Sequence, residues 1–382
     1  MTIVRREYVG LFLLGFLTSL GLFAVHPVLP LYAKQFGVSY RAIGYFFSAY
    51  ALVWVFLQIY AGHLSDKYGR KKFVLLGLVV YGSFAFLCFT AQSFSRLLVF
   101  RMMQGVGLGL FGPAALGLAG GFKEKGKSMA VYRTSEAIGI IFGPILGGLI
   151  GEIGLSYPFL ISMCAAFTAI ACLPLLKEME PSAQVPGFFG SLRSMLKVRS
   201  LLYICAAAFV AELCFASFDV AIPIVGEALG FSTKKIGFVI ASYFIAFSLF
   251  QIPIGIISER LNKKMLLSLN ALIAAIGFVI LVLAGSFWSM VLAMVLLGIT
   301  LGAVFVQSTA VVAELSPVGK KSLYLAFFDS IIDVSFVVMP PVVGWLLVFG
   351  EKIPFVLCVL LMVASASLIS IGLQKERPNS SV

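Results

Sequence analysis

Apolar segments long enough to cross a membrane recur along the whole chain, separated by short clusters of Gly, Pro, Ser and charged residues. A helix needs about 20 mainly apolar residues to span the hydrocarbon core of a bilayer, and twelve segments meet this requirement. The pattern therefore predicts an all-α integral membrane protein. The expected spans are 8–33, 42–63, 73–92, 96–120, 128–152, 156–176, 200–227, 235–258, 265–284, 286–312, 322–349 and 353–373.

Composition excludes a soluble globular protein. The chain is 61% hydrophobic and only 12% charged, whereas about a quarter of the residues in soluble domains are charged. The first span follows Arg5 and Arg6 but is too long for a secretory signal peptide, and no small-residue cleavage site follows it.

The distribution of Lys and Arg predicts the orientation in the membrane. With the N-terminus inside, the cytoplasmic segments hold 21 of the 28 Lys and Arg residues, against six on the other side and Arg101 within a span. Cytoplasmic loops are enriched in these residues, so we expect a multi-pass protein of the cell (cytoplasmic) membrane with both termini in the cytoplasm. This bias and attraction to membrane lipids explain the net charge of +12, which gives no reason to propose a nucleic-acid partner.

The six cysteines all lie inside predicted spans and form no C-x-x-C pair. They are expected to behave as small apolar residues. The sequence therefore implies no disulfide framework, no metal site and no cofactor.

The chain repeats itself with a shift of 193 residues, which aligns 36–72 with 229–265. Two six-span halves explain the repeat, as in many transporters built from duplicated units. The halves are expected at 1–176 and 200–382, joined by a cytoplasmic linker at 177–199. Aligned pairs include Pro30 with Pro223, Tyr50 with Tyr243, Gln58 with Gln251, Asp66 with Glu259, and His26 with Asp219.

Three motifs carry a resemblance to a known family. The segment "GHLSDKYGRKK" (62–72) resembles motif A of the major facilitator superfamily, and "LLVFRMMQGVG" (97–107) resembles its motif B. The segment "GIIFGPILGG" (139–148) resembles motif C of the antiporter branch, although Ala130 replaces the first Gly of that pattern. Together with the span number and the repeat, which cover the whole chain, these motifs are most similar to drug:proton antiporters.

The resemblance implies two pseudo-symmetric six-helix halves, usually in a monomer. Helices 1, 4, 7 and 10 would surround a central cavity, while helices 2, 5, 8 and 11 would form the seam between the halves. The resemblance assigns motif C to the part of the seam that seals the outer side. The motif C residues are Gly139, Gly143, Pro144, Gly147 and Gly148.

Motif A is expected to form a tight turn at the cytoplasmic surface. Gly62 and Gly69 would allow the turn, and Arg70 with its neighbouring lysines would hold it at that surface. Asp66 needs a partner, and a helix N-terminus attracts a carboxylate by roughly 0.3 to 2 kcal/mol. The resemblance implies that this partner is the start of helix 11, at about 320–322, in a contact that latches the cytoplasmic side shut.

Residues 121–128, "GFKEKGKS", match the pattern of a phosphate-binding P-loop. Such a loop requires a preceding β-strand, and none is predicted here. The repeat instead aligns this segment with the start of helix 11, so we interpret it as the start of helix 5. There it is expected to receive Glu259, the second half's equivalent of Asp66. We expect no nucleotide partner, so gradients must drive transport.

Six charged residues lie inside spans, where each costs several kcal/mol unless it faces a cavity or a partner. Five carboxylates among them leave the pathway net negative, which favours protons and cationic substrates. The six are Arg101, Glu136, Glu212, Asp219, Asp329 and Asp333.

Local partners are available to some of these groups and not to others. Glu136 can pair with Arg133 and Asp329 can seat the end of helix 11, whereas Asp219 has either Arg101 or His26 as a candidate partner. Glu212 and Asp333 lie near the middle of the membrane with no local partner. They are the leading candidates for coupling protons to substrate, with Asp219 next and Arg101 promoting proton release.

We therefore expect a transporter rather than an enzyme. The favoured function is proton-coupled export of small hydrophobic or cationic compounds by alternating access. The alternatives are a proton-coupled importer, a carrier of the sugar-efflux type, and a lipid flippase.

Overall fold

The structure, a computed structural model, describes residues 2–122, 124–178, 195, 198–317 and 321–372. Within this part of the chain the regular structure is entirely helical, and twelve stretches are long and apolar enough to span a membrane, as predicted. The helices are α1 (Thr2–Ala24), α2 (Leu29–Lys34), α3 (Tyr40–Tyr68), α4 (Arg70–Phe89), α5 (Phe94–Gly120), α6 (Lys125–Gly151), α7 (Pro158–Cys172), α9 (Arg199–Ala216), α10 (Phe218–Ala228), α11 (Thr233–Arg260), α12 (Lys263–Leu283), α13 (Phe287–Leu315), α14 (Lys321–Asp333), α15 (Ser335–Leu346) and α16 (Ile353–Gly372).

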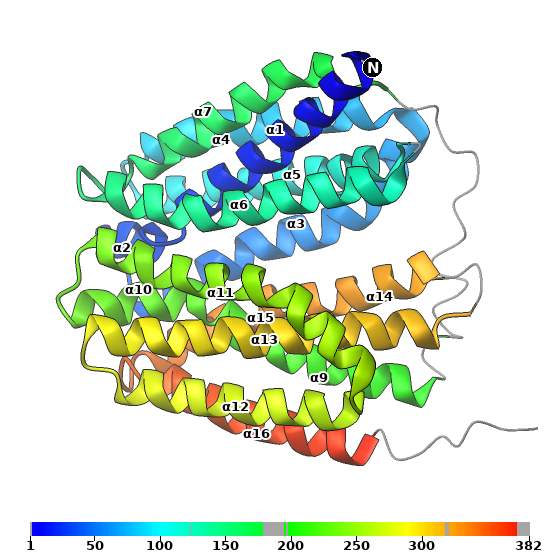
Figure 1. The fold of residues 1–382 in the computed structure, drawn as a ribbon. Coiled ribbons are helices and arrows are strands. Elements are labelled where there is room, and N and C mark those ends of the chain that lie inside the picture. The colour runs from blue at the N-terminus through cyan, green and yellow to red at the C-terminus, as the bar shows by residue number, and fades with distance from the viewer. Residues whose placement is uncertain (1, 123, 179–194, 196–197, 318–320, 373–382) are drawn as a thin grey trace, which may run out of the picture.

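The helices form two bundles, drawn one above the other in Figure 1. Helices α1 to α7 make the first bundle, the N-half, in which α1 packs on α6 and α4 packs on α5. Helices α9 to α16 make the second, the C-half, in which α11 packs on α13 and α12 on α16. This is the two-bundle architecture that the resemblance implies.

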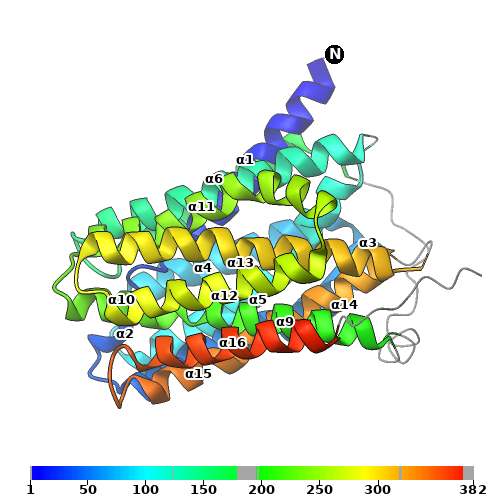
Figure 2. The ribbon, with the colours of Figure 1, turned by 60° about the horizontal axis from the view of Figure 1, so that its bottom comes forward.

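The bundles meet at one end and diverge at the other. Between them, the extended packing is that of α3 with α15 and of α6 with α11. The end that carries α2 and α10 is called the closed end, and the end that carries the start of α1 and the end of α16 is called the termini end (Figures 1 and 2). One apolar core joins both halves at the closed end, whereas a second core, around Leu78 and Leu118, lies within the N-half.

In the described part of the chain, three of the spans consist of two α-helices rather than one. The first is interrupted between α1 and α2, the seventh at Ser217, and the eleventh at Val334. His26, Asp219 and Asp333 lie in these interruptions or within two residues of them. Interrupted helices are a common feature of transporter binding sites, because the freed backbone groups can face a cavity. The apolar pattern of the sequence did not predict the interruptions.

Close backbone contacts hold the closed end together. Gly147 lies so near α1 that a Cβ atom there would overlap the carbonyl oxygen of Ala24, and a Cβ atom at Gly148 would lie 2.5 Å from the carbonyl oxygen of Thr233 in the C-half. Gly139 and Gly143 also contact α1. Motif C therefore packs against α1 and also against the other half, where the Pro144 carbonyl oxygen lies close to Gly237 and Gly148 lies close to Thr233.

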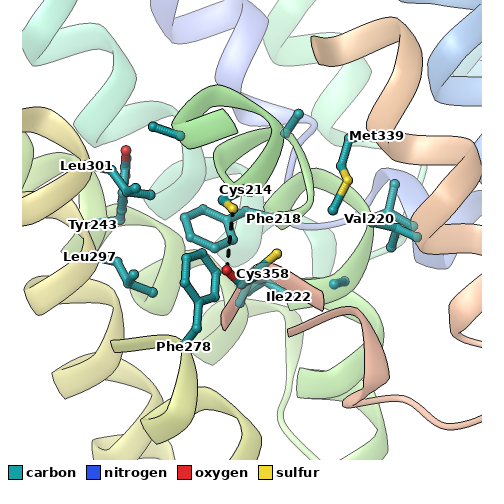
Figure 3. Close-up of a cluster of buried hydrophobic side chains, with 14 of the residues drawn as sticks. Cys214, Phe218, Val220, Ile222, Tyr243, Phe278, Leu297, Leu301, Met339 and Cys358 are labelled. Atoms are coloured by element: carbon teal, nitrogen blue, oxygen red, sulfur yellow. Dashed lines mark hydrogen bonds between the residues drawn. The ribbon is translucent and has the colours of Figure 1, made fainter. Parts of the chain in front are cut away.

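The C-half contributes an aromatic and thiol-containing part of the shared core, shown in Figure 3. Cys214 on α9 and Cys358 on α16 are fully buried there, and the thiol of Cys214 approaches the Cys358 carbonyl oxygen at 3.8 Å. All six cysteines are free thiols.

Candidate functional site

Two ion pairs join the halves at the closed end. His26 Nδ1 lies 2.8 Å from Asp219 Oδ1, and Lys34 Nζ lies 2.6 Å from Glu227 Oε2. The residues of each pair are 193 apart, which is the repeat shift. Equivalent positions of the two halves therefore face each other across the pseudo-symmetry axis, with a basic side chain in the N-half opposite an acidic one in the C-half. Of the two partners left open for Asp219, the structure selects His26.

Further polar contacts between the halves accompany these ion pairs. Ser48 Oγ donates to the Val337 carbonyl oxygen at 2.6 Å, and Thr233 Oγ1 donates to the Gly148 carbonyl oxygen at 2.8 Å. The guanidinium of Arg41 stacks 3.7 Å from the centroid of the Trp345 ring. These contacts make the closed end a firm seal in this conformation.

Glu212 lines a cavity of about 140 Å³ that lies entirely within the C-half. The carboxyl group is surrounded by aromatic side chains and small apolar ones, and no hydrogen bond to it is formed by the residues that the structure describes. Aromatic faces and a carboxylate together suit an organic cation. The lining residues are Ala208, Ala211, Glu212, Phe215, Tyr243, Phe244, Phe247, Leu301 and Phe305.

Asp333 has a partner that sequence reasoning missed. Its Oδ2 accepts a hydrogen bond of 2.7 Å from Nε2 of Gln58, which lies on α3 in the other half. The expectation that Asp333 has no local partner holds for its own helix, but the partner comes from across the interface.

Arg101 is buried within the N-half, 2% exposed. Its Nη1 donates to Gln104 Oε1 at 2.8 Å, and its guanidinium lies 4.1 Å from the centroid of the Tyr50 ring. Among the residues described, no carboxylate forms an ion pair with it. The expected approach of Arg101 to an acid is therefore not made in this conformation, since Asp219 is held by His26.

Glu136 forms the expected local pair, with its Oε2 3.0 Å from Arg133 Nη1. Asp329 is exposed on α14, and in the described part of the chain no side chain forms a hydrogen bond or ion pair with it. We expected Asp329 to hold the end of helix 11 in place, but no contact among the described residues supports this role.

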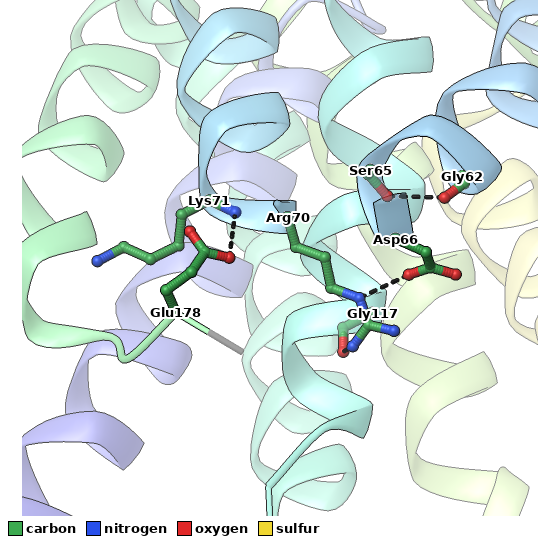
Figure 4. Close-up of polar contacts among 7 residues, drawn as sticks. All are labelled: Gly62, Ser65, Asp66, Arg70, Lys71, Gly117 and Glu178. Atoms are coloured by element: carbon green, nitrogen blue, oxygen red, sulfur yellow. Dashed lines mark hydrogen bonds and ion pairs between the residues drawn. The ribbon is translucent and has the colours of Figure 1, made fainter. Parts of the chain in front are cut away.

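Motif A differs from its expected arrangement in two respects (Figure 4). Gly62 does not contribute to a turn, because α3 continues as a helix to Tyr68, and only Gly69 makes the turn, with φ of 108°. Arg70 is not simply held at the surface. It joins three helices, since its Nε donates to Asp66 Oδ1 at 2.7 Å and its Nη1 donates to the Gly117 carbonyl oxygen at 2.6 Å.

The start of the linker also contacts motif A. Lys71 donates to Glu178 through its backbone N–H at 3.3 Å and to the Leu176 carbonyl oxygen through Nζ at 2.8 Å. Lys320, in the expected partner of Asp66 at about 320–322, lies outside the described residues. The same holds for the side chains of Ser322 and Glu259.

The P-loop look-alike is a connection between two helices. Gly121 directly follows α5, and α6 begins at Lys125. Ser128 is buried, and its hydroxyl donates to the Ala119 carbonyl oxygen at 2.7 Å, so it ties the two helices together. A phosphate-binding loop follows a strand, and a helix precedes this segment.

Metal-binding side chains do not gather in the described part of the chain, where no group of three or more His, Cys, Asp or Glu residues could hold an ion. Three further groups were missed as site residues by sequence reasoning, namely Gln58, Tyr243 and the Lys34–Glu227 pair. The signal was present for the first two, because Gln58 recurs as Gln251 and Tyr50 recurs as Tyr243 in the repeat.

Comparison with known proteins identifies a family and an efflux-related group of relatives. The family described as Major Facilitator Superfamily matches residues 11–216 and 204–382. The multidrug efflux protein YfmO of Bacillus subtilis is 26% identical over 339 residues, covering 86% of this chain and 83% of its own. The quinolone resistance protein NorA of Staphylococcus aureus is 25% identical over 286 residues, covering 72% of this chain and 74% of its own.

Solved structures agree in fold. A point mutant of the nucleoside transporter NupG superposes with a TM-score of 0.85 at 11% identity, covering 96% of this chain and 100% of its own. A bacterial homologue of the human lysosomal transporter Spinster, in an inward-facing and unoccupied conformation, superposes with a TM-score of 0.80 at 15% identity. The match covers 97% of this chain and 95% of the homologue. At these identities the likeness concerns the fold alone.

Proposed function

Because this chain belongs to the Major Facilitator Superfamily of membrane transporters, we propose that it is a proton-coupled exporter of small hydrophobic or cationic compounds. It would act by alternating access between two conformations of its halves. Relatives named for multidrug efflux and quinolone resistance support this choice among the activities of the family.

The observation that carries the proposal is Glu212 in its aromatic cavity. A single carboxyl group among Phe and Tyr side chains attracts an organic cation by charge and by cation–π contact. It offers little to a sugar, whose many hydroxyl groups need several hydrogen-bond partners. The lining therefore favours a hydrophobic cation over a sugar.

The charge distribution supports a cytoplasmic termini end. In this orientation the 21 Lys and Arg residues described above lie on the inside. The conformation would then be inward-facing, with the outer side sealed by the His26–Asp219 and Lys34–Glu227 pairs. The distance from His26 to Asp219 and the distance from Lys34 to Glu227 are expected to lengthen when the outer side opens.

Coupling follows from competition for the same carboxyl groups. Burial away from water favours the protonated form of a carboxyl group, and a nearby cation favours the ionised form. A cationic substrate that enters beside Glu212 therefore expels the proton, and a proton that returns expels the substrate. Asp333 connects this exchange to the arrangement of the two halves, because its hydrogen bond to Gln58 crosses the interface between them.

A proton gradient is sufficient to drive export. One proton that moves down ~100 mV and one pH unit releases roughly 2.3 plus 1.4 kcal/mol. This free energy supports a substrate gradient of several hundredfold, on the order of tenfold for each 1.4 kcal/mol.

Reconstitution in liposomes with an imposed pH gradient tests the proposal. Cationic dyes, sugars and labelled lipids are screened in parallel, and Glu212→Gln is compared with Glu351→Gln, an exposed glutamate at the closed end. We expect the wild-type protein to move a dye in the direction opposite to the proton flow, and we expect Glu212→Gln to lose this activity. Movement of a sugar only, or of lipid only, would replace the proposal by the carrier or flippase alternative.

A further inference from the structure

The N-half carries a groove of about 480 Å³ between α6 and α7, apart from the Glu212 cavity of the C-half. Helix α1 packs on both α6 and α7, whereas α6 and α7 are in little contact with each other. Side chains of α1 therefore form the floor of the groove, and those of α6 and α7 form its walls. The lining is apolar apart from Tyr157, Cys164 and Thr168.

The floor of the groove is fixed to one of its walls. Ser162 Oγ on α7 donates to the Gly21 carbonyl oxygen on α1 at 2.5 Å. A Cβ atom at Gly21 would lie only 3.1 Å from the Cβ atom of Ala165, so the two helices are close here. The groove is therefore preformed, with α1 and α7 held together and α6 on its other side.

The groove faces the membrane. The main packing partners of α7 are α4 and α1 of its own half, and α7 lies on the side of the N-half that is away from the C-half (Figure 1). Cys164 is exposed on this helix, and Phe167 is 43% exposed. Helices α1, α6 and α7 all belong to stretches that can span a membrane. Hydrocarbon chains of lipids therefore surround this face.

The length of the groove matches one leaflet of the bilayer. Tyr157, directly before α7, lines it at the closed end, and Thr168 lines it farther along α7. At about 1.5 Å per residue, the stretch from Tyr157 to Thr168 is roughly 16 Å long, about half of the ~30 Å hydrocarbon core. Tyrosine is typical of the membrane–water interface. The groove thus runs from the interface to about the middle of the membrane, as one acyl chain does.

The connection between α6 and α7, at the mouth of the groove, carries a negative charge. Glu152 is exposed and is the only charged residue of the segment 152–157. No Lys or Arg lies between Arg133 and Lys177 in the sequence. A carboxylate at the level of the lipid headgroups attracts an ammonium group and repels a headgroup of net negative charge. The mouth therefore favours a zwitterionic lipid with an amine over an anionic lipid.

We propose that this groove binds one acyl chain of an amine-bearing zwitterionic phospholipid, such as phosphatidylethanolamine, in the leaflet at the closed end. The chain lies over Leu17 and Leu20 of α1, between α6 and α7, and the amine lies near Glu152. A chain in this place contacts three helices at once, so its many dispersion contacts hold it more firmly than the surrounding lipids are held. The site is separate from the substrate path and does not depend on the proposed function.

Native mass spectrometry tests the site by counting the lipids that the purified protein retains. The protein is taken from vesicles with equal parts of phosphatidylethanolamine and phosphatidylglycerol. We expect the wild-type protein to retain one phosphatidylethanolamine. Thr168→Trp fills the inner end of the groove and should lower this occupancy at least about tenfold. Phe167→Trp, at the neighbouring position outside the lining, is the matched control and should retain the lipid.

The headgroup preference is tested separately. Glu152→Gln removes the charge at the mouth but leaves the apolar lining intact. We expect it to reduce the preference for phosphatidylethanolamine over phosphatidylglycerol about threefold, the size of one exposed charge contact, while a lipid is still retained. An unchanged preference would overturn the assignment of the amine to Glu152.

Cys164 reports occupancy of the groove in protein that carries no groove-filling substitution. Cys172 is replaced by Ser, because the other cysteines are buried, and the rate at which N-ethylmaleimide modifies Cys164 is measured in detergent. Added phosphatidylethanolamine should slow this reaction at least about fivefold, and an added cationic dye should not.

Equal lipid retention in Thr168→Trp and the wild-type protein would overturn the site, as would a rate at Cys164 that the lipid does not change. Protection of Cys164 by the dye alone would also overturn it and assign the groove to substrate. The Cys164 measurement decides the question even where Thr168→Trp lacks a native elution profile.

Discussion

His26 and Asp219 occupy equivalent positions in the two halves of the chain, and their side chains meet at 2.8 Å across the interface. The same relationship holds for Lys34 and Glu227. A duplicated fold brings equivalent residues together wherever they approach its symmetry axis. A basic side chain opposite an acidic one at such positions binds the halves at one end only, which is what a protein that opens at alternating ends requires.

The His26–Asp219 pair should stabilise the closed end more than the Lys34–Glu227 pair. The former side chains are 16% and 17% exposed, the latter 40% and 42%. A hydrogen bond to a charged group that is partly buried contributes about 1.5–3 kcal/mol, whereas an exposed ion pair contributes about 0–1 kcal/mol. We expect His26→Ala to raise the population with an open outer end at least about tenfold, and Lys34→Ala to raise it only slightly.

Spin labels at Gln35 and Ala228, which are exposed beside these pairs, measure that population. Equal effects of the two variants would show that burial of the His26–Asp219 pair adds nothing to the seal.

Gly147 should tolerate no side chain. A methyl group there would overlap the backbone of Ala24, whereas a methyl group at Gly126, in the same helix, would meet open space. Overpacking of this kind costs about 1–3 kcal/mol, and replacing a helical Gly by Ala in open space gains about 0.5–1 kcal/mol. Thermal unfolding of purified protein should show a lower Tm for Gly147→Ala and an unchanged or higher Tm for Gly126→Ala. A loss of Tm in both variants would count against the contact with α1.

Much of the fold was predictable because a bilayer imposes strict demands on sequence. Each span must be apolar and about 20 residues long, so helix number and type follow from the pattern of the chain. The repeat with a shift of 193 residues also predicted the two halves, and it aligned His26 with Asp219.

Other features depend on tertiary contacts that no local pattern encodes. The interruptions at Ser217 and Val334 lie in apolar runs that resemble any other helix. Gln58 and Asp333 are 275 residues apart, so their hydrogen bond follows only from how α3 and α14 lie together. Gly62 looked like a turn residue because it is a glycine near a loop, but the helix continues through it.

Asp66→Asn should weaken the closed state of the termini end. In the present conformation Asp66 accepts from Arg70, and we expect it to exchange this partner for the start of helix 11 on closure. The amide lacks the charge that a helix N-terminus attracts, by roughly 0.3 to 2 kcal/mol, so the inward-open population should rise.

Labels at Leu64 on α3 and Ala326 on α14, both exposed, report this distance, with Lys67→Ala as an exposed control. An unchanged distance distribution in Asp66→Asn together with lost transport would refute the latch.

Substrate-induced proton release from detergent-solubilised protein tests the central claim most directly. A cationic substrate identified in the liposome screen is added to lightly buffered protein, and the released protons are counted with a pH dye. We expect release from the wild-type protein and from the control Glu351→Gln. We also expect a reduction of at least about tenfold, equivalent to about 1.4 kcal/mol of coupling, in Glu212→Gln and in Asp333→Asn, each with a native elution profile. Release at the wild-type level from both single variants and from the double variant would contradict the account and place the coupling site elsewhere.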